Sequence, residues 1–359
     1  MQSQGPKSKV QSPKSKGEVS NDGAGSPFRP FALSPFRLFV HKRLAKRIRR
    51  AYKAVSRSVR YWLGAQLLRV LLAVLPLFPL TFLERVARMI GNLAWHVMRR
   101  NRALALGNLR LALPEQSEGE RLLVSKKVAR SLIVNAFQVA WMAGHRERMR
   151  ELIEIDGLEH VRSALGRGHG VILLGAHFGN FILQCLRLGL EDFAFSTIVN
   201  MPESRSISDI LTRGANELGL NIIPRARAWS ATRDTLNRLK NNEVVCVITD
   251  EEARKGGVFV DFFGYQVPTP RGPALLAARS GAEVLPAFIY RDFGARHRIV
   301  VESPVDIPRD DTAEAVEKGT AIVTKIIENV VRKYPEEWAW ITHRWRKRLD
   351  KSGFGPQSK

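Results

Sequence analysis

The sequence predicts an α/β fold: a mixed, largely parallel sheet flanked by helices, preceded by a helical segment that associates with membranes. From residue 170 to 334, short apolar runs of strand length alternate with longer segments whose apolar residues recur at helical spacing. An apolar run flanked by basic residues precedes them. We expect four parts: a disordered basic tail (1–35), a basic amphipathic helix with a membrane-dipping segment (36–97), a globular α/β domain (98–349) and a flexible tail (350–359).

Positive charge is concentrated at the N-terminus. The chain has a net charge of +23, and residues 1–60 hold 15 Lys or Arg against only Glu18 and Asp22. Residues 1–35 contain few large apolar side chains, so we expect them to be disordered. Residues 41–60 place Leu44 and Ile48 on one helical face and cover most of the rest with Lys and Arg. This pattern suits an anionic membrane surface, and a solvated charged helix is the alternative.

The apolar run at residues 67–83 favours membrane attachment over nucleic-acid binding. It is 17 residues long, and it contains Arg69, Pro76 and Pro79. A spanning helix needs roughly 20 apolar residues, and flanking Lys and Arg resist translocation. We therefore expect a kinked segment that dips into one leaflet, with a single span as the alternative. The two cysteines lie in apolar runs without metal-like spacing, which suits a reducing cytosolic environment.

The elements of the globular domain follow from its periodicity. Residues 98–150 read as helices, and Ser117 with Glu118 and Glu120 predicts a helix start. Further strands are expected at residues 193–199, 221–224, 243–249, 284–290 and 298–302, and an extended segment is expected at residues 258–267. Further helices are expected at residues 206–218, 229–239, 273–279 and 312–334.

The residues with the clearest chemistry lie at 170–190. Residues 171–174 form a strand-like run, Gly175 permits a turn, and residues 178–190 have the pattern of a buried helix. This places His177 at the carboxyl end of a strand and beside a helix N-terminus, which favours a neutral, proton-accepting imidazole. His177 is a candidate general base, and a structural loop histidine is the alternative.

The stretch from His177 to Ile182 reads HFGNFI. It resembles the first motif of the lipid A late acyltransferases (the lauroyl and myristoyl transferases) within the lysophospholipid acyltransferase family. In that family a Glu or Asp completes the motif at the position that Ile182 occupies here. The resemblance implies a glycerolipid acyltransferase-like fold, a catalytic role for His177, and substrate-binding roles for Gly179 and Asn180.

Acidic residues after a later strand offer a substitute for the missing acid. Asp250 and Glu251 follow the strand at residues 243–249, so their carboxylates should emerge at the same sheet edge as His177. Our hypothesis is that Asp250 or Glu251 orients the imidazole. The alternative is an ordinary solvated acidic turn.

Two later blocks also resemble the family. Residues 258–279 contain an FFG sequence followed by Thr269, Arg271 and Gly272 ahead of a helix, an arrangement suited to a phosphate or a developing oxyanion. Residues 334–348 resemble the closing motif, in which His343 and Arg344 would lie near phosphates on a basic helix face. The alternative there is an aromatic helix that caps the core. Arg225 adds positive charge that would suit an acidic carrier protein.

The order of these blocks over residues 95–348 implies the activity. The family moves a fatty acyl chain from acyl carrier protein or acyl-CoA to a hydroxyl of a glycolipid such as a lipid A precursor, at the cytoplasmic face of the inner membrane. We expect no cofactor, no metal site and no nucleic-acid partner. Two alternatives stay open: a lysophospholipid or amino-lipid acyltransferase, and a catalytically degenerate protein that binds acyl chains or lipids.

Overall fold

The computed structural model describes residues 57–225, 228–253 and 255–346. The predicted tails and the larger part of the predicted basic amphipathic helix lie outside these residues. So do Lys347 and Arg348, which the sequence placed on a basic helix face.

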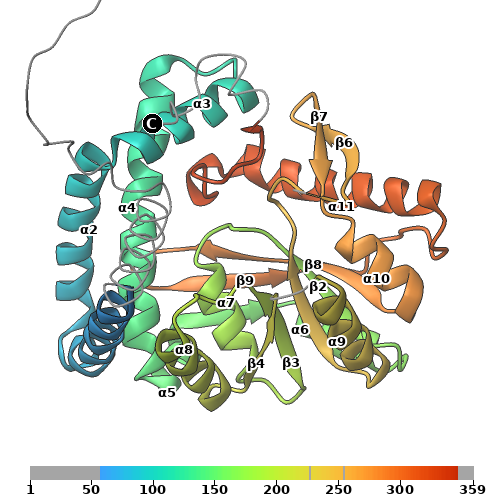
Figure 1. Ribbon diagram of the computed structural model, residues 1–359, viewed down its shortest axis with the longest axis horizontal. Helices are drawn as coiled ribbons and strands as arrows, with labels where there is room; N and C mark the ends of the chain where they lie inside the picture. The colour runs from blue at the N-terminus through green and yellow to red at the C-terminus, as the bar shows by residue number, and fades with distance from the viewer. Residues whose placement is uncertain (1–56, 226–227, 254, 347–359) are drawn as a thin grey trace, which may run out of the picture. The chain divides into compact units, whose positions relative to one another are not determined.

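A seven-stranded mixed sheet forms the centre of the domain, as predicted (Figure 1). Its strand order is β1-β9-β8-β2-β5-β3-β4, and only the β8–β9 pairing is antiparallel. The strands are β1 (Ile153–Asp156), β2 (Val171–Gly175), β3 (Phe195–Val199), β4 (Leu220–Pro224), β5 (Val244–Ile248), β8 (Glu283–Arg291) and β9 (His297–Val301). Strand β1 is too short and too polar for the sequence pattern to have revealed it.

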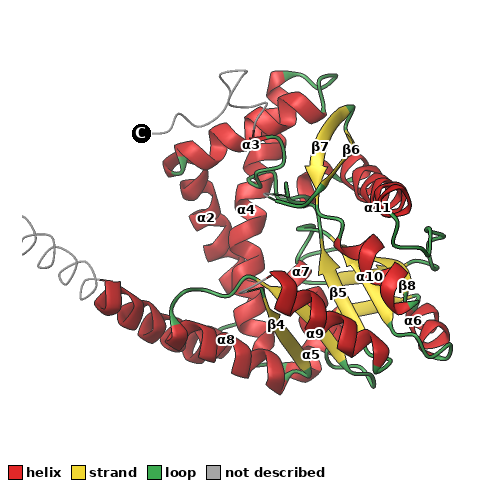
Figure 2. Cartoon of the chain, turned by 45° about the vertical axis from the view of Figure 1, so that its right-hand side comes forward, coloured by secondary structure: helices red, strands yellow, loops and turns green. Residues whose placement is uncertain are grey.

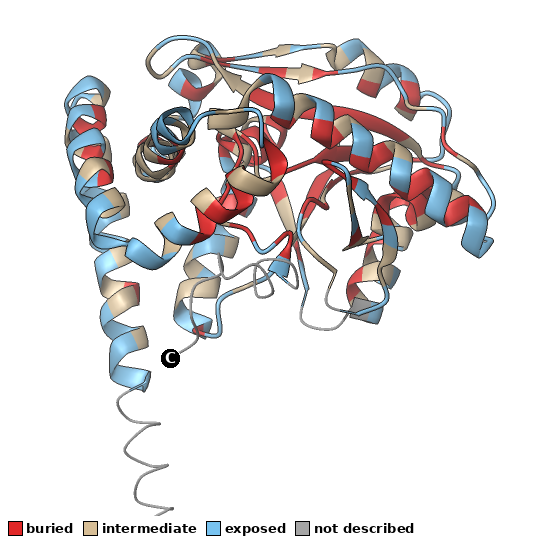
Figure 3. Ribbon diagram, turned by 90° about the horizontal axis from the view of Figure 1, so that it is seen from above, coloured by how far each residue is buried: buried red, intermediate tan, exposed pale blue. Residues whose placement is uncertain are grey.

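Alternate residues of the central strands enter two separate cores, one on each face of the sheet. Ile172 and Leu174 of β2 pack with one set of helices, whereas Val171 and Leu173 pack with the other. Buried residues accordingly concentrate on the strands and on the helix faces that meet them (Figure 3). The helices of this layered part are α6 (Leu158–Leu165), α7 (Phe181–Leu188), α8 (Arg205–Glu217), α9 (Ala228–Lys240), α10 (Gly272–Ser280) and α11 (Ala313–Lys333).

A group of helices precedes the sheet. A helix at Arg57–Leu77, which ends in the 3-10 turn η1 (Leu75–Leu77), is followed by α2 (Leu80–Val97), α3 (Arg99–Ala112), α4 (Glu118–Ala143) and α5 (Arg146–Leu152). The predicted apolar run at 67–83 is therefore divided between two helices, because Pro79 interrupts the chain after Phe78. Among the described residues, Arg57–Leu77 is the one helix long and apolar enough to cross a membrane.

Helices α2 and α4 lie side by side (Figure 2). Their close approach depends on Gly91, where a Cβ atom would lie 2.7 Å from the Cα of Arg130. The opposite side of α2 exposes large apolar side chains, among them Phe82, Met89, Leu93 and Val97. Helix α4 begins at the predicted position, because Ser117 and Glu120 form a capping box.

Two predicted elements differ in the structure. The extended segment at 258–267 is a hairpin of β6 (Val258–Phe262) and β7 (Tyr265–Thr269), turned at Phe263 and Gly264, which both have positive φ. Most of the closing block is not a helix: after the 3-10 turn η2 (Pro335–Glu337) it continues as turns and bends through residue 345. Trp338, Trp340 and Trp345 fill the core there, at most 1% exposed.

Candidate active site

The register of two neighbouring strands brings His177 and Asp250 together. Strands β2 and β5 are parallel, and Gly175 pairs with Ile248 at their carboxyl ends. His177 and Asp250 each follow two residues later, so both side chains emerge at one edge of the sheet. The central position of β2, between β5 and β8, makes this edge well supported on both sides.

Asp250 accepts three hydrogen bonds from nitrogen donors. Its Oδ1 atom lies 2.8 Å from His177 Nδ1, and its Oδ2 atom accepts from the His177 backbone N–H at 3.0 Å. Trp338 Nε1 donates to the same Oδ2 at 2.6 Å. The Asp250 side chain is completely buried, whereas that of His177 remains 28% exposed. An ionised carboxylate is the form that can accept from three donors at once.

The two residues shift each other's pKa. Burial by itself lowers the pKa of His177, but the charge and hydrogen bond of Asp250, with help from Glu251, outweigh it and raise the pKa to about 9. Burial raises the pKa of Asp250, but His177 and the N–H donors together hold it below its ordinary value. The expectation that this position favours a neutral imidazole is therefore wrong, because the charge of Asp250 favours the protonated ring. In the neutral form, with Nδ1 turned toward Asp250, the proton stays on Nδ1 and Nε2 is the free base.

The turn that carries His177 is fixed on both sides. Gly179 has a φ of +55°, and a Cβ atom there would lie 2.2 Å from the carbonyl oxygen of Ile289, so only glycine fits. Its N–H donates to the Glu337 carbonyl at 2.8 Å, and its own carbonyl accepts from Asn135 Nδ2 at 2.9 Å. Asn180 caps helix α7 by accepting from the Leu183 N–H.

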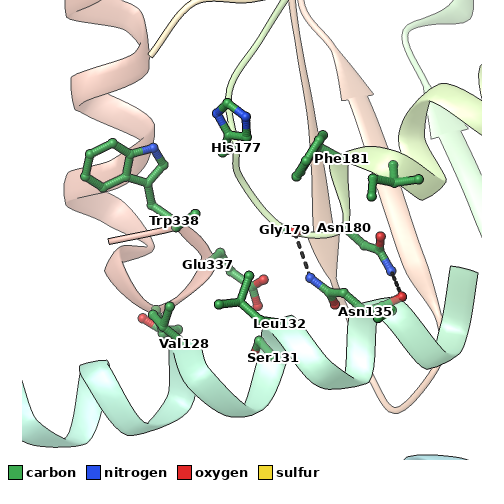
Figure 4. Close-up of a pocket in the computed structure, with 14 residues that line it drawn as sticks. Val128, Ser131, Leu132, Asn135, His177, Gly179, Asn180, Phe181, Glu337 and Trp338 are labelled. Carbon is green, nitrogen blue, oxygen red and sulfur yellow. Dashed lines mark hydrogen bonds between the residues drawn. The ribbon is translucent and has the colours of Figure 1, made fainter. Parts of the chain in front are cut away.

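A pocket of about 110 Å³ opens beside His177 (Figure 4). Helix α4 forms one wall, the 177–182 stretch a second, and residues 336–339 the third. The α4 wall is mainly apolar, with Val128, Leu132 and Ala136 facing the pocket. The site therefore combines an imidazole with an adjoining hydrophobic surface.

Ile182 lines this pocket and is 45% exposed. Residue 182, where the motif resemblance implies an acid, is thus an apolar side chain that lines the pocket. His177 Nδ1 is already taken by Asp250. The partner of the imidazole consequently comes from the loop that follows β5 and not from the helix that follows His177.

Other predicted site residues lie at varying distances from this centre. Glu251 is exposed and contributes charge to His177. Arg271 is exposed at the N-cap of α10, and Gly272 is the first residue of that helix. Arg225 is exposed just beyond β4, which is three strands from β2 in the sheet. None of these residues lines the pocket beside His177.

The prediction that Arg344 lies on an exposed basic face is wrong. Arg344 is 1% exposed, stacks over Phe262, and donates to the Glu251 carbonyl and to Thr269 Oγ1. Burial lowers its pKa to about 10, although Asp250 opposes that shift. Thr269 is buried as well, so both residues support the loop after Asp250 from within. His343 is exposed, and its carbonyl accepts from the Glu252 N–H.

Sequence reasoning missed two residues of the site. Trp338 was assigned to packing, yet it donates directly to Asp250. Asn135 was placed on a helix without obvious chemistry, yet it holds the Gly179 carbonyl. The sequence did contain a sign of the role of Asn135, because it is a polar residue on the apolar face of a long helix. Among the described residues, no three His, Cys, Asp or Glu side chains gather as metal ligands would.

Several known proteins are similar to this chain in amino-acid sequence. The chain is 28% identical to the lipid A biosynthesis lauroyltransferase of Escherichia coli (strain K12) over 296 residues, covering 80% of this chain and 93% of that one. It is 29% identical to the phosphatidylinositol mannoside acyltransferase of Mycobacterium tuberculosis (strain ATCC 25618 / H37Rv) over 210 residues, 58% of this chain and 65% of the other.

A solved structure also matches, that of the 1-acyl-sn-glycerophosphate acyltransferase PlsC from Thermotoga maritima. It has 14% identity and a TM-score of 0.22, and the match covers 66% of this chain and 97% of that one. The family model for the bacterial lipid A biosynthesis acyltransferases matches residues 50–347. The chain is therefore an acyltransferase that belongs to the bacterial lipid A biosynthesis acyltransferase family.

Proposed function

We propose that this protein transfers a fatty acyl chain from acyl carrier protein, or from acyl-CoA, to a hydroxyl of a membrane glycolipid such as a lipid A precursor. The observation that carries the proposal is the His177–Asp250 pair, at 2.8 Å, beside an apolar pocket. The names of the relatives, which include acyltransferases for lipid A and for a phosphatidylinositol mannoside, agree with a glycolipid acceptor.

In this proposal His177 acts as the general base. Its Nε2 atom takes the proton of the acceptor hydroxyl, and the oxygen attacks the carbonyl carbon of the thioester. The carbon–sulfur bond breaks, the imidazolium returns its proton to the thiolate, and an ester and a free thiol result. Asp250 stabilises the imidazolium during these steps, so it takes the part that the family gives to the acid at position 182.

Two backbone N–H groups near the imidazole already have partners within the protein, so other donors must stabilise the oxyanion. The N–H of His177 is bonded to Asp250, and that of Gly179 is bonded to Glu337. These two backbone groups are engaged within the protein. We therefore assign the contacts to the oxyanion and to phosphate to Arg271 and to the backbone N–H groups at the start of α10, where Gly272 lies. We assign the contacts to the carrier or to the lipid headgroup to the exposed side chains of Arg225 and His343.

Membrane attachment belongs to the same proposal. Phe82, Met89, Leu93 and Val97 recur on one side of α2, and the helix at Arg57–Leu77 exposes further large apolar side chains. An apolar surface of this kind needs a partner, and the basic N-terminal residues would add attraction to anionic lipids. We place the domain at the cytoplasmic face of the inner membrane.

The decisive experiment is acyl transfer by the purified full chain in lipid vesicles. Acyl carrier protein and CoA thioesters are compared as donors, a lipid A precursor and a lysophospholipid are compared as acceptors, and products are identified by mass spectrometry. We expect ester formation on the lipid A precursor and its loss in His177→Ala. Transfer only to the lysophospholipid would replace the proposed acceptor. Binding of acyl chains without any transfer would make the protein a degenerate binder.

A further inference from the structure

Buried polar side chains connect α2 to the turn that carries His177. Glu84 on α2, Gln138 on α4 and Asn180 after His177 are 5%, 0% and 2% exposed, respectively. Gln138 Nε2 donates to Glu84 Oε1 at 2.7 Å, and Asn180 Nδ2 donates to Gln138 Oε1 at 3.4 Å. We call this chain of three side chains the buried relay.

The relay has one polarity. Glu84 is paired with Arg88 at 3.0 Å, and as a carboxylate it offers only acceptors to Gln138. Gln138 must therefore turn its NH₂ group toward Glu84 and its oxygen toward Asn180. Asn180 in turn must direct its NH₂ group at α4, which leaves its own oxygen free to accept from Leu183 and cap α7. The Glu84 carboxylate thus sets the orientation of the Gln138 amide, and the Asn135 carbonyl, which accepts from Asn180 Nδ2 at 3.3 Å, holds Asn180 in the matching orientation.

A second contact holds the same turn one helical turn away along α4. Asn135 Nδ2 donates to the Gly179 carbonyl at 2.9 Å, while Asn135 Oδ1 accepts from Arg291 Nη2 at 2.6 Å. Figure 4 shows Asn135 reaching toward Gly179 and Asn180 from α4. Residues 135 and 138 share one face of α4, so the turn is anchored at two successive points.

The position of this turn sets the geometry of the catalytic pair. The His177 backbone and ring both contact Asp250, so a displaced turn would lengthen both contacts together. A buried polar network favours a single arrangement only when each of its polar groups has a hydrogen-bond partner. Gln138 meets this condition, because its amide nitrogen donates to Glu84 and its amide oxygen accepts from Asn180.

We propose that Gln138 is a positioning residue for the acyl transfer: through Asn180 it holds His177 against Asp250, and through Glu84 it makes that position depend on α2. The rate effect rests on the proposed function, whereas the geometry of His177 does not. Because α2 exposes its other face as an apolar surface, the relay links the lipid-facing helix to the base.

Two substitutions separate positioning from stability. Gln138→Met keeps the length of the side chain but removes both hydrogen bonds. Ser125→Ala is the matched control, because Ser125 is also buried on α4 and accepts from Trp95 of α2 at 3.2 Å, yet it lies outside the pocket and the relay. Thermal unfolding measures the stability of each variant, and kcat and KM are measured in vesicles.

A reciprocal exchange tests the polarity of the relay. Gln138→Glu alone would set a second carboxylate against Glu84. The double variant Glu84→Gln with Gln138→Glu keeps the net charge, because it removes one carboxylate and adds another. The new amide at residue 84 can donate to the new carboxylate at residue 138, which can still accept from Asn180. We expect the single variant to lose activity and the double variant to recover to within a few-fold of the parent.

The readout at His177 is its imidazole titration, followed by NMR in the full-length protein. The charged groups that shift the pKa of the ring are Asp250 and Glu251, and Glu336 and Glu337 are the other acidic residues that line the pocket. Gln138→Met changes none of these charges, so a shift reports a changed distance to Asp250. We expect the pKa of His177 to fall from about 9 toward 6.5 in Gln138→Met and to stay unchanged in Ser125→Ala.

At a pH above 9, where His177 is mainly neutral in both proteins, we expect kcat to fall about ten- to a hundred-fold in Gln138→Met with little change in KM, since small misplacements of a catalytic group have effects of that size. An unchanged His177 titration and kcat in Gln138→Met, or equal losses in Ser125→Ala, would overturn the proposal. If the parent transfers no acyl chain, the proposed function fails, and the His177 titration still decides whether the relay positions the base.

Discussion

His177 and Asp250 lie opposite each other because each stands two residues beyond a paired position, Gly175 in β2 and Ile248 in β5. Strand register thus brings the two residues within reach of each other, and the Nδ1–Oδ1 distance is 2.8 Å. A pair built on two strands of a central sheet is held by many ladder hydrogen bonds, which makes it rigid. This explains how the chain keeps an oriented imidazole with isoleucine at position 182.

The pH dependence of the reaction follows from the raised pKa of His177. A base acts in its neutral form, and with a pKa of about 9 only about 1% of His177 is neutral at pH 7. We expect kcat/KM to rise about tenfold per pH unit and to level off near pH 9. Steady-state rates between pH 6 and 10 measure this, and His177→Ala should show no such rise. A plateau already at pH 7 would contradict the raised pKa.

Asp250 and Glu251 should differ sharply on substitution. Asp250→Asn offers only one acceptor oxygen to three N–H donors, so any orientation leaves its NH₂ group facing a donor. We expect transfer to fall by about two to three orders of magnitude, and the free energy of unfolding to fall by about 3 kcal/mol.

Glu251→Gln is the matched control, because Glu251 is exposed and acts on His177 only through its charge. We expect a small downward shift of the pH profile and nearly unchanged stability. Rates and urea unfolding measured on both variants test this difference. Full activity in Asp250→Asn would remove Asp250 from the mechanism.

Trp338→Phe removes one donor to Asp250 and keeps an aromatic ring in the core. Without the Nε1–H group, more of the carboxylate charge acts on His177, so the pKa of His177 should rise and the pH profile should move to higher pH. We expect a stability loss of about 2 kcal/mol from the lost hydrogen bond to a charged acceptor. Trp340→Phe is a suitable control, because Trp340 Nε1 donates to the Pro335 carbonyl and not to Asp250. A profile that moves downward would show that Trp338 acts in another way.

Ile182→Glu is expected to lower activity. The side chain lines an apolar pocket, and the imidazole already has its carboxylate in Asp250. A carboxylate at residue 182 would have to be desolvated when an acyl chain enters, which corresponds to about a tenfold loss in kcat/KM, or ~1.4 kcal/mol. Ile182→Val keeps the apolar character and should retain most activity. An increase in turnover in Ile182→Glu would instead indicate that the parent lacks an effective partner for His177.

The apolar face of α2 should control membrane binding. Met89→Glu and Leu93→Glu each place a charge where a large apolar side chain is exposed. Burying such a side chain contributes about 1.5–3 kcal/mol, so each change should weaken vesicle binding at least roughly tenfold. Phe259→Glu, on the β6–β7 hairpin, is the control with similar exposure. Co-sedimentation with phosphatidylglycerol vesicles measures the effect, and equal binding by all three variants would exclude α2 as the membrane surface.

The sequence by itself determined the alternation of strands and helices, the capped start of α4, and the position of His177 at a strand end. These features depend on periodicity, turn residues and caps, which act over a few neighbouring residues. Strand β1 and the turn in the 258–269 hairpin escaped that kind of reasoning because short polar strands and tight turns carry weak local patterns.

Only the tertiary structure decided which strand lies beside β2, and therefore that Asp250 meets His177. It also placed Arg344 inside the core and turned Trp338 toward a carboxylate, although the sequence had assigned Arg344 to a surface and Trp338 to packing alone. Strand order, register and burial are set by contacts between residues far apart in the chain, where the gain from packing outweighs local preference. For that reason the candidate base could be named from its sequence neighbours, whereas the choice of Asp250 over Glu251 as its hydrogen-bond partner required the fold.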